Sequence, residues 1–408
     1  MPLGMLPLSG IRVADFTWAW AGAYGAELLG ALGAQVIKIE NHKRIDGTRK
    51  YSNVTYWTPL TGVEESLQYQ EFNRDKLDIT LDLSSRDGVE LAKRLILVSD
   101  VVAENFRPGV MSKLGFDYAV VRKLRPDVVM VSTSAVGQTG PERLAAGVAV
   151  CFAAAGGLSS LTGYPDRPPS EVRGPSDLRA GNTWVYALLA ALVHRQRTGE
   201  GQFVDVSATE ALSALVGDAI VDSAMNGHAP TRTANNDARW APHGCYRCRG
   251  DDAWVTIVVA TEEEWNAFCG AVGRADWLTD ERFADAPRRK RHERELDALI
   301  EEWTRQRTPY EIMETLQRAG VAASPTFTCR DLCTDAHISA RKSFQDVSHP
   351  VVGTGKALAT PWIFDGERLK FRRHGPLLGE HNTHVLAELL GVTIHAIEQY
   401  RAAGVIGP

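Results

Sequence analysis

The stretch Ile11-Arg12-Val13-Ala14-Asp15-Phe16 is a short, largely apolar run typical of a buried strand. A segment with helical periodicity follows from about 23 to 32, and Gly33-Ala34 ends it. A second apolar run, Gln35-Val36-Ile37-Lys38-Ile39-Glu40, comes directly after. Two strands joined by one helix predict a parallel pair with a right-handed crossover.

The same alternation continues along the first half of the chain. A helical pattern at 86–98 precedes the strand-like run 100–104, and another at 117–124 precedes 128–132. Repeated units of this kind predict an α/β domain with an open parallel sheet. Ligands of such sheets bind at the carboxyl ends of the strands. We therefore expect one crevice to be formed by the segments Thr17–Gly22, Asn105–Arg107 and Ser134–Gly140.

The pattern changes near residue 225. A polar, loop-like segment at 226–236 is followed by strand-like runs over 244–259 and by charged helices to about 320. We predict a large domain over 1–224, a smaller α+β domain over 225–345, and a segment over 346–408 that returns to the large domain.

Composition narrows the functional classes. The 408 residues carry a net charge of −5 without a long basic run, so nucleic acid is not an expected partner. We expect no membrane partner, because no apolar run approaches the roughly 20 residues of a membrane span. The first residues do not resemble a signal peptide. Six cysteines in this length fit a reducing compartment, and we expect a cytoplasmic protein.

Two cofactor hypotheses are weak. Cysteine and histidine side chains suggest a zinc site by their spacing, but their flanks lack knuckle character; they are Cys245, Cys248, Cys329, Cys333, His243 and His337. The turn after the first strand lacks the G-x-G-x-x-G fingerprint of a dinucleotide site, and Trp18 and Trp20 occupy it instead. We predict no metal and no cofactor.

Asp177 is the candidate nucleophile. It lies in Gly174-Pro175-Ser176-Asp177-Leu178-Arg179-Ala180-Gly181, where a turn ends and a long apolar helix begins. The helix dipole and free backbone N–H groups would keep its carboxylate ionised, and an ionised aspartate can attack a carbonyl. The alternative is that Asp177 only caps the helix.

Several motifs resemble the class III CoA-transferases. They run in order from residue 8 to about 405 and include Leu8–Phe16, Leu32–Glu40, Asn73–Lys76, Thr80–Leu83, Glu104–Gly109, Gly137–Pro141 and Gly174–Gly181 with Arg197–Gln202. The resemblance implies a Rossmann-like large domain, a small domain and two subunits interlocked as rings. It implies that Asp177 attacks an acyl-CoA thioester, so that acyl-CoA and a carboxylic acid are the substrates. By position, the CoA contacts are Trp20, Ala21, Gly22, Asn105, Phe106 and Lys113.

Substrate contacts are expected at Trp18, Tyr24, Gln138 and Val148. In the racemases of this family a Gly-His-Asp triplet stands where this chain has Gly147-Val148-Ala149, and valine cannot move a proton. The loop 226–241 has one glycine, Gly227, where oxalate-specific members carry several, so its role as a lid is open. The aromatic loop resembles that of members acting on larger acids, such as benzylsuccinate CoA-transferases. A racemase or isomerase, and a non-catalytic subunit of a heteromer, remain the alternatives.

Overall fold

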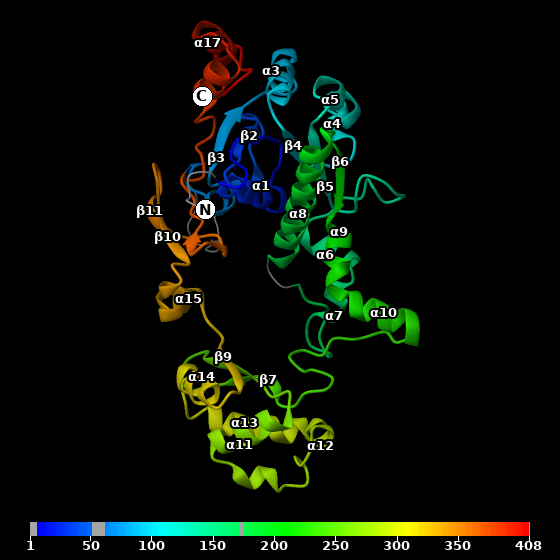
Figure 1. Ribbon diagram of the computed structural model, residues 1–408, viewed down its shortest axis with the longest axis vertical. Coiled ribbons are helices and arrows are strands. Elements are labelled where there is room, and N and C mark those ends of the chain that lie inside the picture. Colours follow the sequence, from blue (N-terminus) through cyan, green and yellow to red (C-terminus); the bar gives the residue numbers. More distant parts are fainter. Residues whose placement is uncertain (1–5, 51–61, 172–173, 408) are drawn as a thin grey trace. The chain divides into compact units, whose positions relative to one another are not determined.

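The computed structural model describes residues 6–50, 62–171 and 174–407. Within this part of the chain two compact units are found (Figure 1). Unit 1 comprises Met1–Ser160, Glu171–Pro230 and Ser339–Pro408, and unit 2 comprises Leu161–Ser170 and Thr231–Ile338. The sequence places the domain boundaries near 225 and 345 and does not assign Leu161–Ser170 to the smaller domain.

Unit 1 is built on a parallel sheet. Its six strands, as far as the described residues show, follow the order β3-β2-β1-β4-β5-β6, and each neighbouring pair is parallel. In this doubly wound order β2 and β3 are added on one side of β1 and β4 to β6 on the other, so the order of addition switches between β1 and β4. The strands are β1 (Arg12–Asp15), β2 (Gln35–Glu40), β3 (Lys76–Thr80), β4 (Val101–Glu104), β5 (Val129–Ser134) and β6 (Phe203–Ser207).

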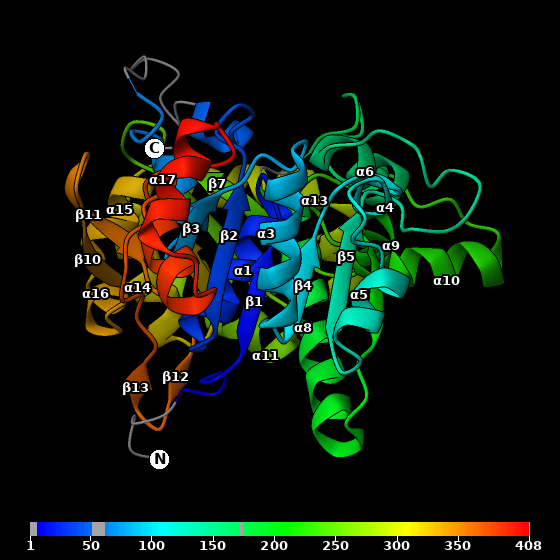
Figure 2. The same cartoon turned by 90° about the horizontal axis from the view of Figure 1, so that it is seen from above.

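Helices cover both faces of the sheet, so each face has its own apolar core (Figure 2). On one face, α1 (Ala21–Ala31) and α8 (Pro175–Thr198) pack on residues such as Val36, Val101 and Val131. On the other, α3 (Arg86–Leu97) and α17 (Ile394–Ala402) cover residues such as Ile37 and Met130. The remaining helices of unit 1 include α2 (Leu67–Phe72), α4 (Val110–Lys113), α5 (Tyr118–Leu124), α6 (Ala149–Ala155), α7 (Leu158–Leu161, which ends at the boundary with unit 2), α9 (Ala208–Ser213) and α10 (Gly217–Asn226).

Two glycines let α1 and α8 approach closely. A Cβ atom at Gly25 would lie 2.3 Å from the Trp184 ring, and one at Gly181 would lie 2.8 Å from Tyr24. Trp184 Nε1 donates a hydrogen bond of 3.1 Å to the Ala21 carbonyl oxygen. The start of α1 and the first half of α8 therefore form one rigid body.

The strand β3 is not predicted from the sequence. Its five residues, Lys-Leu-Asp-Ile-Thr, are all buried, including Lys76 and Asp78. An ionisable residue in an apolar run suggests that one face of the strand is exposed to solvent. In β3 these side chains have partners inside the protein. Lys76 Nζ donates to Ala23 O and Asn73 Oδ1, each at 2.9 Å, and Asp78 Oδ1 accepts from Gly379 N–H at 2.6 Å.

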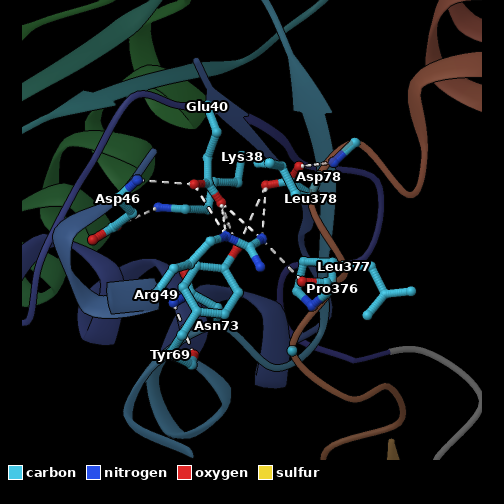
Figure 3. A network of polar contacts seen from close by, with 12 residues as sticks. Lys38, Glu40, Asp46, Arg49, Tyr69, Asn73, Asp78, Pro376, Leu377 and Leu378 are labelled. Carbon is cyan, nitrogen blue, oxygen red and sulfur yellow. Dashed lines mark hydrogen bonds and ion pairs between the residues drawn. The ribbon is translucent and has the colours of Figure 1, made fainter. Parts of the chain in front are cut away.

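The end of the chain completes unit 1. Val385 and Leu386 of the π-helical turn η4 (His384–Leu389) and Ile397 of α17 lie in the same core as β1 to β5. Ahead of η4, residues 376–379 meet a buried polar network around Arg49 (Figure 3). The C-terminal return to the large domain is thus packed and hydrogen-bonded.

Unit 2 is an α+β body. An antiparallel sheet of order β7-β8-β9 packs against helices around buried residues such as Trp265, Trp277 and Phe268. The elements are β7 (His243–Arg247), β8 (Trp254–Val258), β9 (Ala322–Pro325), α11 (Glu262–Val272), α12 (Ala286–Arg291), α13 (Glu293–Thr304), α14 (Pro309–Arg318) and α15 (Cys329–Thr334). Near the boundary, and after it in unit 1, come α16 (Ala336–Ala340) and the hairpins of β10 (Phe344–His349) with β11 (Gly353–Leu358) and β12 (Ile363–Phe364) with β13 (Glu367–Arg368). In the described ranges no helix has the length and apolarity to span a bilayer.

Candidate functional site

The loops after β1 and β4 meet where the strand order reverses. Asn105 joins them, because its Oδ1 accepts a hydrogen bond from Trp18 N–H and its Nδ2 donates to Trp18 O, both at 2.7 Å. A Cβ atom at Gly22 would lie 2.8 Å from the Asn105 side chain and 2.6 Å from Thr17. Glycine at 22 therefore lets α1 start directly against Asn105.

Glu104 fixes the other side of this junction, a role that the sequence analysis does not assign. Its Oε2 accepts from Phe106 N–H at 2.7 Å, and its Oε1 accepts from Ser132 Oγ. Burial raises the pKa of Glu104 to about 7, although both hydrogen bonds oppose the shift. The turn that presents Asn105 and Phe106 is thereby held by a buried carboxyl group.

The aromatic side chains of the first loop are packed in pairs. The Trp18 ring lies edge-on to Phe106 at 6.2 Å between centroids, and Arg44 lies 5.8 Å from the centre of the Trp18 ring. Trp20 and Tyr24 both pack on Phe72, at 5.0 and 6.1 Å. Phe72 belongs to α2, which the sequence analysis does not identify.

Asp177 is not the N-cap of α8. Gly174 holds that position in the left-handed region, at φ 85°, and Asp177 lies in the first turn. Gly181, one turn further along the same face, lies against Ala21 and Tyr24, and Gly174 lies beside the Trp20 ring. Asp177 therefore shares the stripe of α8 that faces the start of α1.

The environment of Asp177 raises the pKa of its side chain. Burial, and then the Glu171 carboxylate, raise its pKa from 3.8 to about 6. No hydrogen bond or ion pair within the described residues reaches its side chain to stabilise the charge. Burial thus outweighs the helix dipole that the sequence analysis expects to keep the group ionised. Even so, the carboxylate form predominates at pH 7, and a more basic carboxylate is a stronger nucleophile.

Small residues bring four segments together next to this stripe. An apolar cluster around Phe152 and Leu212 links α1, the end of β5, α6 and α8. The alanines that join these segments in it are Ala21, Ala135, Ala149 and Ala180. Val148 precedes α6 with 66% of its surface exposed.

Gln138 lies in the loop after β5. Its backbone N–H donates to both oxygens of Asp205 at 3.0 Å. Its Nε2 atom is buried and has no hydrogen-bond partner in the part of the chain that the structure describes.

The predicted site residues thus fall into three groups. Trp20, Ala21 and Tyr24 contact the residues of α8 that flank Asp177. Trp18, Gly22, Asn105 and Phe106 form the adjoining junction, in which the Asn105 amide is already engaged with Trp18. Lys113 is exposed at the end of α4. Gln138 and Val148 lie on neighbouring segments, the loop after β5 and the residue before α6.

The cysteines are dispersed. Cys248 is buried in unit 2, Cys245 is partly buried, and Cys329 and Cys333 are exposed on α15. Over the described ranges, no group of three or more histidine, cysteine, aspartate or glutamate side chains is arranged to hold a metal ion. The zinc hypothesis thus gains no geometric support, and the absence of a cofactor stays a prediction.

Similarity to known proteins decides the family. Residues 8–382 match the model described as CoA-transferase family III. The chain belongs to CoA-transferase family III. A succinyl-CoA–D-citramalate CoA-transferase of Chloroflexus aurantiacus is 33% identical over 413 residues, covering 98% of each chain. A succinate–glutarate CoA-transferase of Agrobacterium fabrum is 30% identical over 390 residues, covering 95% of this chain and 97% of the relative.

The fold agrees with that membership. The crystal structure of a CAIB/BAIF family protein from Brucella suis matches with a TM-score of 0.84 and 31% identity, over 94% of this chain and 100% of that one. A relative with 31% identity over 408 residues, 98% of each chain, is named the beta subunit of a succinyl-CoA–L-malate CoA-transferase of C. aurantiacus. The present chain is accordingly a CoA-transferase, an enzyme of acyl-CoA metabolism whose relatives include enzymes named for succinyl-CoA.

The raised pKa of Asp177 predicts a stability effect with a defined sign. Since the folded-state pKa is above the ordinary value of 3.8, the native state loses stability as pH rises through 3.8 to about 6. Asp177→Asn is expected to raise the free energy of unfolding of unit 1 at pH 8 by at most about 3 kcal/mol, with no gain at pH 3. Urea unfolding at both pH values measures this. Asp87→Asn, at an exposed first-turn aspartate of α3, is the control; equal gains at both pH values would contradict the prediction.

Proposed function

We propose that the enzyme moves CoA from succinyl-CoA to a carboxylic acid through covalent intermediates on Asp177. The observation that supports this most directly is the Asp177 carboxylate: it is partly buried, has no described hydrogen-bond partner, and lies on the stripe of α8 that faces Trp20 and Tyr24. A half-buried carboxylate that no described residue engages is available to attack a thioester carbonyl.

The proposed reaction balances without an added proton. An Asp177 oxygen attacks the thioester carbonyl, the C–S bond breaks, and an aspartyl anhydride and CoA thiolate result. The thiolate attacks the aspartyl carbonyl and releases succinate, which leaves an enzyme thioester. The acceptor carboxylate then attacks this thioester and releases the thiolate. Attack of the thiolate on the acceptor's own carbonyl gives the new acyl-CoA and restores Asp177.

Backbone N–H groups support these steps. The first-turn N–H groups of a helix have no intrahelical acceptor, and in α8 those of Ser176 and Asp177 belong to this class. They are donors suited to the negative oxygen that develops in each addition.

Two other functions are less well supported. A racemase or isomerase would need a second proton-exchanging group, and at the matching triplet the chain has Val148 and Ala149, which cannot exchange protons. A non-catalytic subunit would not need the nucleophile, yet Asp177 is present and its environment makes it more basic.

For the acceptor we propose a dicarboxylic acid with a bulky or aromatic apolar part, of the benzylsuccinate type. The relatives named above are called citramalate, malate and glutarate CoA-transferases, so dicarboxylates are the starting class. The rings of Trp20, Tyr24 and Phe72 supply apolar surface next to α8, and the small Val148 and Ala149 leave room.

We propose that the enzyme assembles as an intertwined dimer, of two copies or with a related subunit. In the described helix α10 no residue is buried. Its exposed residues include the apolar Ile220, Val221 and Met225, whose side chains are 51%, 54% and 78% exposed. An apolar helix face of this kind is typical of a surface covered by a partner. A relative named as the beta subunit of a CoA-transferase is consistent with either composition.

Asp177→Ala is expected to lower the rate of CoA transfer by several orders of magnitude while leaving the fold intact, because covalent catalysis is lost. The assay is exchange of CoA between succinyl-CoA and labelled succinate. Hydroxylamine added during turnover should leave a hydroxamate on Asp177, detected by peptide mass spectrometry. Asp87→Ala serves as the matched control, and near-normal exchange by Asp177→Ala would refute the nucleophile.

A panel of acceptors tests the substrate proposal. We expect benzylsuccinate to be preferred over oxalate and formate, and Trp20→Ala to raise its KM more than that of succinate. Loss of one buried ring face should change the KM by about tenfold or more. Trp254→Ala, in unit 2, is the control. Equal loss for both acids would limit Trp20 to its contact with CoA, and oxalate or formate as best acceptor would overturn the acceptor proposal.

Interlocked chains cannot separate without unfolding, so dilution should not produce monomers. Sedimentation of fluorescently labelled enzyme at nanomolar concentration is expected to show only the dimer. A folded monomer under these conditions would exclude the intertwined assembly, and Met225→Glu would then show whether α10 forms a simpler interface.

A further inference from the structure

The turn that carries Trp18 and Trp20 is held in an unfavourable conformation. Ala19 has φ 57°, in the left-handed region that a residue with a Cβ atom rarely adopts, and its surface is exposed. Apolar packing of an exposed alanine cannot hold this conformation. The restraint must therefore come from the backbone polar groups of the turn.

Those groups are tied to a buried ion pair. Ala19 N–H lies 3.3 Å from each carboxylate oxygen of Asp46, and Thr17 O accepts a hydrogen bond of 2.8 Å from Lys38 Nζ. Lys38 and Asp46 are joined at 3.1 Å and both side chains are 0% exposed. Since Asn105 holds Trp18 from the other side, backbone groups of all three residues before Trp20 are fixed.

Asp46 is itself rigidly held. Its backbone N–H donates to Glu40 at 3.1 Å, and its Oδ1 accepts from the N–H and the hydroxyl of Thr48, both at 2.9 Å. Glu40 in turn binds Arg49, as Figure 3 shows. A carboxylate locked from behind in this way transmits its position to the turn and does not adapt to it.

We propose that Asp46 is a positioning residue of the transfer reaction: its carboxylate holds the left-handed turn at Ala19 and so sets the Trp20 ring against the start of α8. The inference rests on the proposed function, because it assumes that the CoA thioester binds beside Trp20 and Asp177. The effect of Asp46 on the substrate is indirect and passes through the turn.

Asp46→Asn tests the proposal. The amide replaces one acceptor oxygen by a donor that faces Lys38, so the turn loses part of its restraint. We expect the KM for succinyl-CoA to rise about tenfold, with kcat changed less, because misplacement of a binding loop weakens substrate positioning. The Kd of CoA itself, from titration calorimetry, should rise in parallel. The control is Asp100→Asn, a carboxylate bound by Arg125 and Arg195 at the amino edge of the same sheet, which should lower the Tm without raising the KM.

Rescue separates positioning from general stability. Glycine adopts the left-handed conformation without a Cβ penalty. The double variant Asp46→Asn with Ala19→Gly should therefore have a KM for succinyl-CoA at least about threefold lower than that of Asp46→Asn alone. A merely structural Asp46 would give a double variant no better than the single one. If Asp46→Asn does not fold, Ala19→Val strains the exposed turn directly, because β-branched residues are outliers there, and the same rise is expected.

Two outcomes stay distinct. Wild-type enzyme that transfers no CoA refutes the proposed function, whereas the calorimetric Kd for CoA still reports on the turn. If transfer is normal in the wild type, and Asp46→Asn and Ala19→Val both keep its KM and Kd, the positioning role is overturned.

Discussion

Unit 1 depends on the contacts that the buried guanidinium of Arg49 makes with four parts of the chain. The guanidinium is fully buried, stacks 3.6 Å from the centre of the Tyr69 ring, and donates to Glu40 at 2.9 Å, to Glu64 at 2.7 Å and to Pro376 O at 3.0 Å. A buried cation is tolerated only when its donors are satisfied. These partners come from distant parts of the sequence, so one side chain fixes strand β2, the segment before α2 and the C-terminal return in a single arrangement.

The charges around Arg49 are unequal. Burial favours the neutral form of Glu40, but Arg49 and Lys38 reverse this and lower its pKa to about 2. Burial and the Glu40 carboxylate raise the pKa of Asp78 well above its ordinary value. Glu40 is therefore ionised, while Asp78 is favoured to keep its proton. The two acidic side chains can then share one cation without mutual repulsion.

The sequence predicts the parallel strands well and the buried polar elements poorly. β2 has the predicted bounds, because apolar runs between helices carry a strong signal. Lys76–Thr80 is missed because its charges are satisfied by residues that only the fold brings near. At the site, the resemblance to the family predicts roles for Asp177, Trp20 and Asn105. It does not reveal that Gly174 takes the cap, that Phe72 packs on two aromatic rings, or that Asn105 is occupied by Trp18, since each depends on contacts between distant segments.

The packing of residues 385–406 into the core of β1 to β5 has a consequence for biosynthesis. A ribosome makes the chain from its N-terminus, and β1 to β6 emerge long before Val385, Leu386 and Ile397. Until then one face of the sheet lacks part of its apolar cover, and Arg49 lacks the carbonyl of Pro376. The nascent sheet therefore stays incompletely covered while Thr231–Ile338 of unit 2 is translated. During this interval its exposed apolar face is prone to aggregation and in need of chaperones.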